Sequence, residues 1–267
     1  MVRLPAVAGR FYSSDARELA RQIRQFCPAD TEKIAARACI VPHAGYMYSG
    51  HVAGAVYSSL RIPSRCILLG PRHFPRGASM AILTEGTWRT PFGEAPVDSA
   101  LGRELARACP HLQEDAVAHE REHSLEVHLP FLQTLAKDFR FVPVVLAADR
   151  YPLLEDLGRA VARAVAAQSE PVLVIASSDM NHHEGDAITR TKDARAIDRI
   201  LALDPRGLYD TVRSEGITMC GYAAAVAMLV AMLELKASEA KLVRYATSGD
   251  INGDRNEVVG YAGILIR

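Results

Sequence analysis

Short apolar runs alternate along the chain with longer segments of helical periodicity. Four runs have the length and composition of buried strands, and they cover 38–42, 65–70, 139–146 and 171–176. A clear helical pattern covers 153–167, between the last two of these runs. Strands that alternate with helices in this way predict an α/β protein, with helices on both faces of a mostly parallel sheet.

Further elements complete this expected domain. A helix is predicted to begin near Ser124 and to run to about 136, because leucines recur there at helical spacing. The strongly apolar segment 222–235 is too short to cross a bilayer and predicts a buried core helix. The runs 241–247 and 258–266 predict a closing hairpin. No linker or low-complexity segment interrupts the chain, so we expect one domain over 1–267.

Composition narrows the classes of function. Lys plus Arg and Asp plus Glu each number 31, so the formal net charge is zero, which argues against nucleic-acid and membrane partners. The start, Met1 to Pro5, lacks the long apolar stretch of a signal peptide. Five cysteines without a CxxC pair favour free thiols and a cytoplasmic location.

The candidate metal-binding and catalytic residues lie at the ends of strands or at the start of a helix. His43 and His73 each follow a buried strand and a proline, and ligands of open α/β sheets bind at the carboxyl ends of strands. We expect the two strands to be neighbours, so that the two imidazoles could face one point in space. The segment Asp179–His183 follows another strand, and Cys220 precedes a helix. Imidazole, thiolate and carboxylate are ligands for zinc, iron and copper, so we expect a metal ion at this edge.

Each group also has a simpler interpretation. His119 and His123 form a literal H-E-x-x-H match, which we interpret as a chance match in a loop, because the apolar helical period starts only after it. Ser177 follows a strand, but no G-x-S-x-G elbow supports a serine nucleophile. Cys220 is either a small buried residue or a reactive thiol, whose pKa the helix N-terminus would lower. Asp179 and His182 are three residues apart, so on a helical turn the carboxylate would orient the imidazole.

Taken together, the motifs resemble the Memo family, called AmmeMemoRadiSam system protein B in bacteria and archaea. The motifs, in chain order, are Arg3-Leu4-Pro5-Ala6-Val7-Ala8-Gly9-Arg10-Phe11-Tyr12, Pro42-His43-Ala44-Gly45-Tyr46, Gly70-Pro71-Arg72-His73, His123-Ser124-Leu125-Glu126-Val127-His128-Leu129-Pro130, Ser177-Ser178-Asp179 with His182, and Cys220-Gly221. The resemblance covers essentially the whole chain. It implies a three-layer α/β/α fold similar to the catalytic subunit of class III extradiol dioxygenases.

The resemblance also implies a site. His43, His73 and Cys220 take the metal-ligand positions, and Asp179 and His182 line the same pocket. The related dioxygenases bind iron through two histidines and a carboxylate, so a cysteine in place of the carboxylate favours softer metals. We expect iron, as in the related dioxygenases, or copper, with zinc possible. The family name implies a pathway shared with a radical-SAM protein and an AMMECR-type protein.

Three functions follow as hypotheses. The first is a non-haem metal-dependent dioxygenase or redox enzyme for a small molecule, in which His182 is the general base, oriented by Asp179, and His123 donates a hydrogen bond to substrate or oxygen. In this hypothesis the apolar wall of the pocket consists of Phe11, Tyr48 and Trp88. The second is a non-catalytic protein that binds metal or a peptide in the same cleft. The third is a zinc hydrolase.

Overall fold

The computed structural model describes residues 1–28, 31–136 and 138–267, and a large mixed sheet lies at its centre. Within the described residues this sheet consists of β2 (Ala38–Val41), β3 (Arg65–Pro71), β4 (Met80–Ile82), β7 (Gln113–Glu114), β8 (Arg140–Leu146), β9 (Val172–Ser177), β10 (His182–Glu184), β11 (Ala240–Thr247) and β12 (Val258–Ile266). Their order in space is β10-β12-β2-β9-β3-β8-β4-β7, and β11 pairs with β12. The central strands β2, β9, β3 and β8 run parallel.

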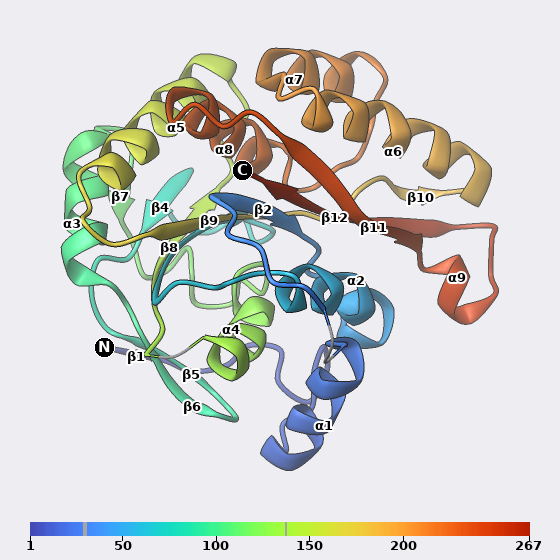
Figure 1. Cartoon of the computed structure of the whole chain (residues 1–267), viewed down its shortest axis with the longest axis horizontal. Helices are drawn as coiled ribbons and strands as arrows, with labels where there is room; N and C mark the ends of the chain where they lie inside the picture. The colour runs from blue at the N-terminus through green and yellow to red at the C-terminus, as the bar shows by residue number, and fades with distance from the viewer. Residues whose placement is uncertain (29–30, 137) are drawn as a thin grey trace.

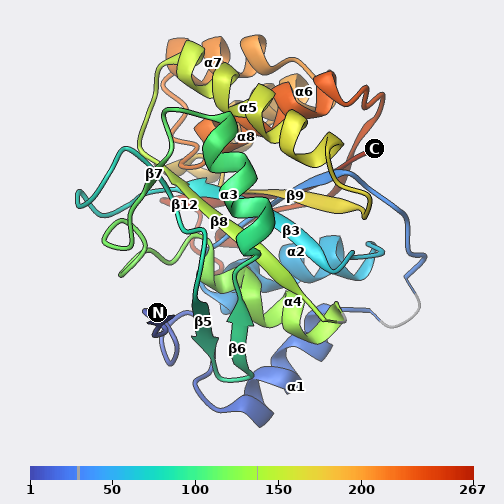
Figure 2. The ribbon, with the colours of Figure 1, turned by 90° about the vertical axis from the view of Figure 1, so that its left-hand side faces the viewer.

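Helices cover both faces of this sheet (Figures 1 and 2). One face carries α3 (Ser99–Ala108), α5 (Tyr151–Ala166), α6 (Asp186–Leu201), α7 (Pro205–Ser214) and α8 (Tyr222–Glu234). The other face carries α1 (Ala16–Phe26), α2 (Tyr46–Ser58) and α4 (Leu129–Leu135), the last preceded by the 3-10 turn η1 (Glu126–His128). The short helix α9 (Gly249–Asn252) lies between β11 and β12. The predicted α/β fold is therefore confirmed, with its helices and strands in three layers.

The two helical layers follow from the alternation of side chains along the strands. In β3, Ile67 and Leu69 join the core under α5 and α8, whereas Cys66 and Leu68 join the core under α2 and α4. Successive side chains of a strand point to opposite faces, so a strand buried on both sides must be apolar throughout. This requirement explains why the central strands are continuous apolar runs.

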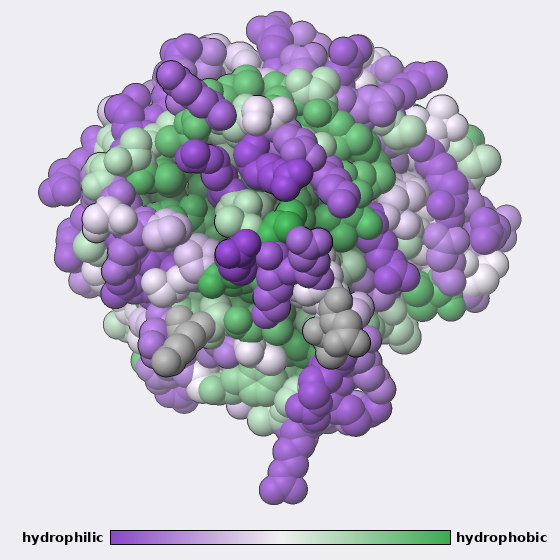
Figure 3. Space-filling model, viewed as in Figure 1, coloured by the Kyte–Doolittle hydropathy of each residue, from purple (hydrophilic) through white to green (hydrophobic). Residues whose placement is uncertain are grey.

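The predicted core helix and closing hairpin are both present. Helix α8 packs against α5, α7 and the sheet, and most of its side chains are buried. None of the described helices is both long and apolar enough to cross a membrane. β11 and β12 pair antiparallel, as the two apolar runs predicted. All five cysteines are free thiols. Hydrophilic side chains cover much of the face in Figure 3, with apolar patches between them.

A small second sheet ties the start of the chain to the main fold. It consists of β1 (Val2–Arg3), β5 (Thr87–Thr90) and β6 (Gly93–Pro96). The Arg3 guanidinium forms an ion pair of 2.6 Å with Glu126, and both side chains are buried. Glu126 also accepts hydrogen bonds from the backbone N–H groups of Ala6 and Val7 and from the Tyr12 hydroxyl. One buried carboxylate thus anchors the whole segment from Arg3 to Tyr12.

Two expectations about local structure were wrong. The helix expected from Ser124 begins only at Leu129, because the residues before it form a 3-10 turn in which the Glu126 side chain binds the start of the chain. The strands that precede His43 and His73 are not neighbours, because β9 lies between β2 and β3. The strand that separates them contributes a site residue of its own, Ser177.

Candidate metal centre

Three histidines meet at the carboxyl edge of the sheet. His43 follows β2, His73 follows β3, and His123 lies in the loop before η1. One ring nitrogen of each lies within 4.8 Å of the others, so the group could hold a metal ion. The rings of His73 and His123 stack at a centroid distance of 4.5 Å, and the His43 ring lies 5.2 Å from that of His73. The sequence predicted the convergence of His43 and His73, but it assigned His123 to another role.

Glu122 orients His73. The His73 Nδ1–H donates to Glu122 Oε1 at 2.8 Å, and the His73 backbone N–H donates to Oε2 at 2.5 Å. Burial would raise the pKa of Glu122, but the hydrogen bonds from the His73 ring and from the backbone of His73 and Ser124 outweigh burial and lower the pKa to about 2. The carboxylate therefore stays ionised and accepts the Nδ1–H of His73, and in the neutral imidazole this places the lone pair on Nε2. A carboxylate behind a histidine is a common arrangement around metal ligands.

His43 is held at both its ring and its backbone. Its Nδ1 lies 2.7 Å from Ser177 Oγ, and its backbone N–H donates to Asp179 Oδ1 at 2.7 Å. Burial lowers the pKa of His43 well below its ordinary value, and the charges of His123 and His73 lower it further. His43 is therefore neutral near pH 7, which is the state in which an imidazole can bind a metal.

His123 is covered by the start of the chain. The Phe11 ring lies edge-on to it at a centroid distance of 4.8 Å. Burial lowers the pKa of His123 to about 4, although the nearby Glu122 carboxylate opposes this shift. Phe11, predicted as part of the pocket wall, is therefore beside the cluster. The Glu126 anchor that orders the segment up to Tyr12 also keeps Phe11 in this position.

The Cys220 thiol also lies beside His43, although Cys220 directly precedes α8, in the helical layer on the opposite face of the sheet from α2. Its Sγ lies 3.3 Å from His43 Nε2. The expectation that the helix N-terminus lowers its pKa was wrong: burial raises the pKa of Cys220, and the nearby Asp179 carboxylate raises it further. Without a bound cation Cys220 is therefore a thiol, and its Sγ is within hydrogen-bond distance of His43 Nε2.

Gly221 permits this close approach. A Cβ atom at this position would lie against the Ser177 carbonyl oxygen and 2.6 Å from the Ser178 Cβ. We expect Gly221→Ala to lower the free energy of unfolding by about 1–3 kcal/mol, because the start of α8 must move away from β9. Urea unfolding measures this cost. The matched control is Gly185→Ala, since a Cβ there meets its nearest atom at 3.7 Å. Equal stability of the two variants would contradict this account.

His182 lies nearby, but Asp179 does not orient it. The His182 Nδ1–H donates to the Thr218 carbonyl at 3.0 Å, and the His182 backbone N–H donates to Thr218 Oγ1 at 2.7 Å. Asp179 instead accepts from the backbone of His43 and Ala44. The helical spacing argument fails because His182 belongs to strand β10. Burial raises the pKa of Asp179 to about 6, although its hydrogen bonds oppose this shift.

The other predicted wall residues lie in different surroundings. Tyr48, on α2, is partly buried and packs against the small apolar cluster that contains Val52 and Tyr261. Trp88 is 1% exposed and lies in the core with its ring 5.7 Å from that of His119, under the Arg3 guanidinium. The structure therefore places Trp88 with His119 and not with the three clustered histidines. The H-E-x-x-H match is not helical, as expected, and its two histidines point to different sites.

The buried imidazoles make stability depend on pH. Burial lowers the pKa of both His119 and His128 to about 3, so each is neutral in the folded protein and protonated below about pH 6.5 when unfolded. The unfolded state then binds more protons, and the free energy of unfolding falls as the pH falls from 7 to 5. Asp179 and Asp193 oppose this trend, since burial raises the pKa of each to about 6.

A single substitution isolates one share of this effect. We expect His119→Leu to reduce the loss of stability between pH 7 and pH 5 by about 2 kcal/mol, because one neutral buried imidazole is removed. Urea unfolding of both proteins at the two pH values measures the difference. An unchanged pH dependence would show that His119 has the same pKa in the folded protein as in the unfolded chain, which would contradict this account.

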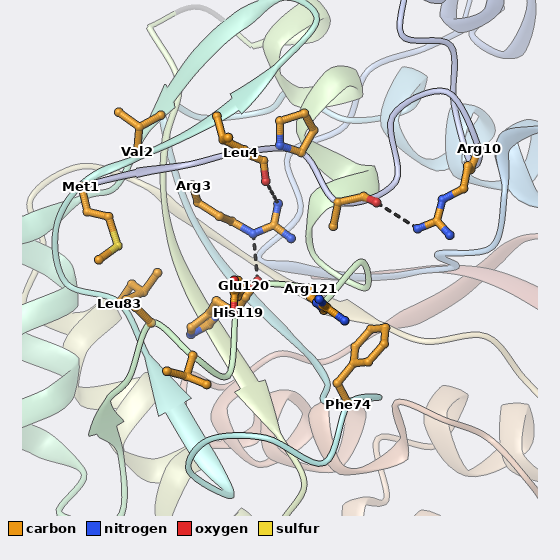
Figure 4. A pocket seen from close by; sticks show the side chains of 14 residues that line it. Met1, Val2, Arg3, Leu4, Arg10, Phe74, Leu83, His119, Glu120 and Arg121 are labelled. Atoms are coloured by element: carbon orange, nitrogen blue, oxygen red, sulfur yellow. Dashed lines mark hydrogen bonds between the residues drawn. The ribbon is translucent and has the colours of Figure 1, made fainter.

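A groove of about 730 Å³ lies between the start of the chain and the loops that carry Phe74 and His119 (Figure 4). It is lined by Met1, Val2, Arg3, Leu4, Pro5, Ala6, Arg10, Phe74, Leu83, Ala116, Val117, His119, Glu120 and Arg121. Phe74 directly follows His73, and Arg121 directly precedes Glu122, so the groove and the cluster share two loops. Figure 4 shows the side chains of Arg10 and Arg121 at the same side of the groove as Phe74.

The donor set suits a transition metal. Neutral imidazoles and a thiol are ligands for iron, copper and zinc, whereas magnesium and calcium prefer oxygen donors. Glu122 engages Nδ1 of His73 and Ser177 engages Nδ1 of His43, so Nε2 is in each residue the ring nitrogen that these two groups do not hold. The residues present therefore fit a metal ion of the expected kind.

Fold and site together define a three-layer α/β protein with a histidine cluster at the carboxyl edge of its sheet. A family model described as Memo-like protein matches residues 3–265. A MEMO1 family protein from Methanopyrus kandleri is 39% identical, over 100% of this chain and 99% of its own length. Another, from Archaeoglobus fulgidus, is 40% identical over the whole of both chains. The chain belongs to the Memo family, as its motifs predicted.

A solved structure supports the fold alone. An uncharacterized protein from Escherichia coli K12 superposes with a TM-score of 0.56, covering 85% of this chain and 98% of that one. The two sequences are 13% identical, so the likeness extends to the α/β architecture and to no particular residue of the site.

Proposed function

We propose that this protein binds a transition metal through His43 and His73, with Cys220 and His123 as further donors, and uses it as a metal-dependent redox enzyme on a small molecule. Iron or copper is the proposed metal, with zinc as the alternative. The observation that carries the proposal is that one ring nitrogen from each of three histidines lies within 4.8 Å of the others. Hydrogen bonds at Nδ1 orient two of these rings, those of His73 and His43. A bound iron or copper ion would supply one-electron chemistry toward oxygen.

His182 is the proposed general base. Its Nδ1–H donates to the Thr218 carbonyl, so its Nε2 carries the lone pair. Burial lowers the pKa of His182, which keeps the imidazole neutral at pH 7. A neutral imidazole can accept the proton of a substrate hydroxyl, and the substrate class proposed is therefore a catechol-like or enediol-like molecule. Phe11 supplies an apolar contact beside His123.

His123 has two possible roles that one measurement separates. As a third ligand it would contribute strongly to metal affinity, whereas as a hydrogen-bond donor to substrate or oxygen it would not. We expect His123→Ala to weaken Co²⁺ binding in a spectroscopic titration, because its ring nitrogen lies within 4.8 Å of the other two. Unchanged Co²⁺ affinity would assign His123 to the donor role.

Oxygen consumption by the iron-loaded protein with a panel of catechols tests the proposed reaction. We expect turnover, and we expect His182→Ala to lower the rate about 100-fold or more while the metal content is unchanged. The matched control is His183→Ala, because His183 is an exposed neighbour. Tightly bound metal with no oxygen consumption would favour a metal- or peptide-binding protein, and ester turnover with zinc would favour a hydrolase.

We also propose that this protein has pathway partners, which its family membership implies. A pathway shared with a radical-SAM protein and an AMMECR-type protein would place a small reactive molecule upstream or downstream of this site.

A further inference from the structure

We infer that Ser177 and His128 are positioning residues that fix the tautomer of His43 and so aim its Nε2 lone pair at the metal centre. This inference rests on the proposed function for its consequence, because it deepens the account of the same site. Its physical basis is the hydrogen-bond geometry of buried groups, which can be tested without any metal.

The Ser177 hydroxyl has three partners in close contact. Its Oγ lies 2.6 Å from the Ser124 carbonyl oxygen, 2.7 Å from His43 Nδ1 and 2.7 Å from His128 Nε2. A hydroxyl has one proton and two acceptor lone pairs. Because a carbonyl oxygen can only accept, the single proton of Ser177 goes to Ser124. Both imidazoles must then donate to Ser177, which places the proton of His43 on Nδ1 and that of His128 on Nε2.

The far side of His128 agrees with this assignment. Its Nδ1 lies 2.9 Å from the Tyr57 hydroxyl. With the His128 proton on Nε2, Nδ1 has a lone pair that accepts from Tyr57. Each polar side-chain atom of this hydrogen-bond network then has a partner. The opposite tautomer of His128 would leave its Nε2 and Ser177 Oγ facing each other as two acceptors.

The members of this hydrogen-bond network are buried, and burial determines how strongly the network fixes the proton positions. Tyr57, His128 and Ser177 are each 1% exposed or less, so water does not replace a lost partner. An unpaired buried polar atom costs free energy, and a fully paired network therefore favours one proton arrangement over the others. The consequence at the site is that His43 presents a bare Nε2, 3.3 Å from Cys220 Sγ.

The role of Ser177 was not visible in the sequence, where it invited comparison with serine nucleophiles. Its hydroxyl proton is held by a carbonyl oxygen and its side chain is fully buried. The structure assigns it to the orientation of His43 instead. His128, five residues after the cluster member His123, supplies the second donor that forces the arrangement.

Long-range proton–nitrogen correlation NMR of the metal-free protein tests the assignment directly. We expect opposite tautomers in the two residues, with Nδ1–H in His43 and Nε2–H in His128. Loss of the corresponding signals in His43→Ala identifies the first residue. Finding Nε2–H in His43, or Nδ1–H in His128, would overturn the inference.

A Co²⁺ titration tests the consequence. We expect Ser177→Ala to bind Co²⁺ about 10–100-fold more weakly than the wild type, because His43 loses the acceptor that holds its proton on Nδ1. The matched control is Ser58→Ala, another buried serine, whose hydroxyl donates within α2. Equal affinity of the two variants would overturn the positioning role. A wild type that binds no Co²⁺ would refute the proposed function, while the NMR result still decides the tautomers.

Discussion

Glu126→Ala is expected to lower the free energy of unfolding by about 3–5 kcal/mol, the cost of removing one partner from a buried ion pair. The Arg3 guanidinium, 2.6 Å away, would remain buried without its counter-charge. The backbone N–H groups of Ala6 and Val7 and the Tyr12 hydroxyl would lose their acceptor as well. Urea unfolding at pH 7 measures the change.

A surface pair provides the control. Glu18 and Arg21 form a bidentate pair of similar length on α1, but both side chains are exposed. Glu18→Ala should leave stability almost unchanged, since solvent screens the pair. The site gives a second readout, because loss of the anchor should free Phe11 from His123. A Glu126→Ala protein as stable as Glu18→Ala would contradict the anchoring role.

Glu122→Ala is expected to weaken metal binding about 10–100-fold, which is the usual cost of removing the partner behind a ligating histidine. The carboxylate holds the His73 ring through Nδ1 and its backbone through N–H. Without it, the ring of His73 is free to rotate and its Nε2 no longer has a fixed direction. A Co²⁺ titration measures the loss.

Glu120→Ala is the matched control, two residues away. Glu120 is exposed and its nearest basic partner, Arg76, lies 3.9 Å away. We expect its Co²⁺ affinity to equal that of the wild type. The role assigned to Glu122 would be refuted if both variants bound Co²⁺ as tightly as the wild type.

Local patterns in the sequence were enough to predict the architecture and half of the site. Buried strands could be identified in the sequence because each must be apolar on both faces. The candidate histidines after β2 and β3 were found from the same pattern. The closing hairpin followed from two apolar runs around a turn. These features depend on neighbours in the chain, so they are visible without a structure.

Partners distant in the chain could not be predicted in this way. The strand order places β9 between β2 and β3, and this brings Ser177 to His43 across 134 positions. The Arg3–Glu126 pair joins residues 123 positions apart. No local periodicity records such contacts, because they are created by the packing of the whole sheet.

Two predictions about individual side chains were wrong because they were made from neighbours in the sequence alone. The helix N-terminus was expected to lower the pKa of Cys220, but the depth of burial and the nearby Asp179 raise it. The spacing of Asp179 and His182 was interpreted on a helix, whereas His182 lies on strand β10 and is held by Thr218. Burial and the direction of a side chain are properties of the folded protein.

Elemental analysis of the protein purified without oxygen tests the central claim most directly, alongside the variants His43→Ala, His73→Ala, His123→Ala and Cys220→Ser. We expect about one iron or copper ion per chain in the wild type and loss of that metal in His43→Ala and His73→Ala. The other two variants decide which further donor completes the site. A wild-type protein that holds no metal, even after reconstitution with iron, copper or zinc, would contradict the account.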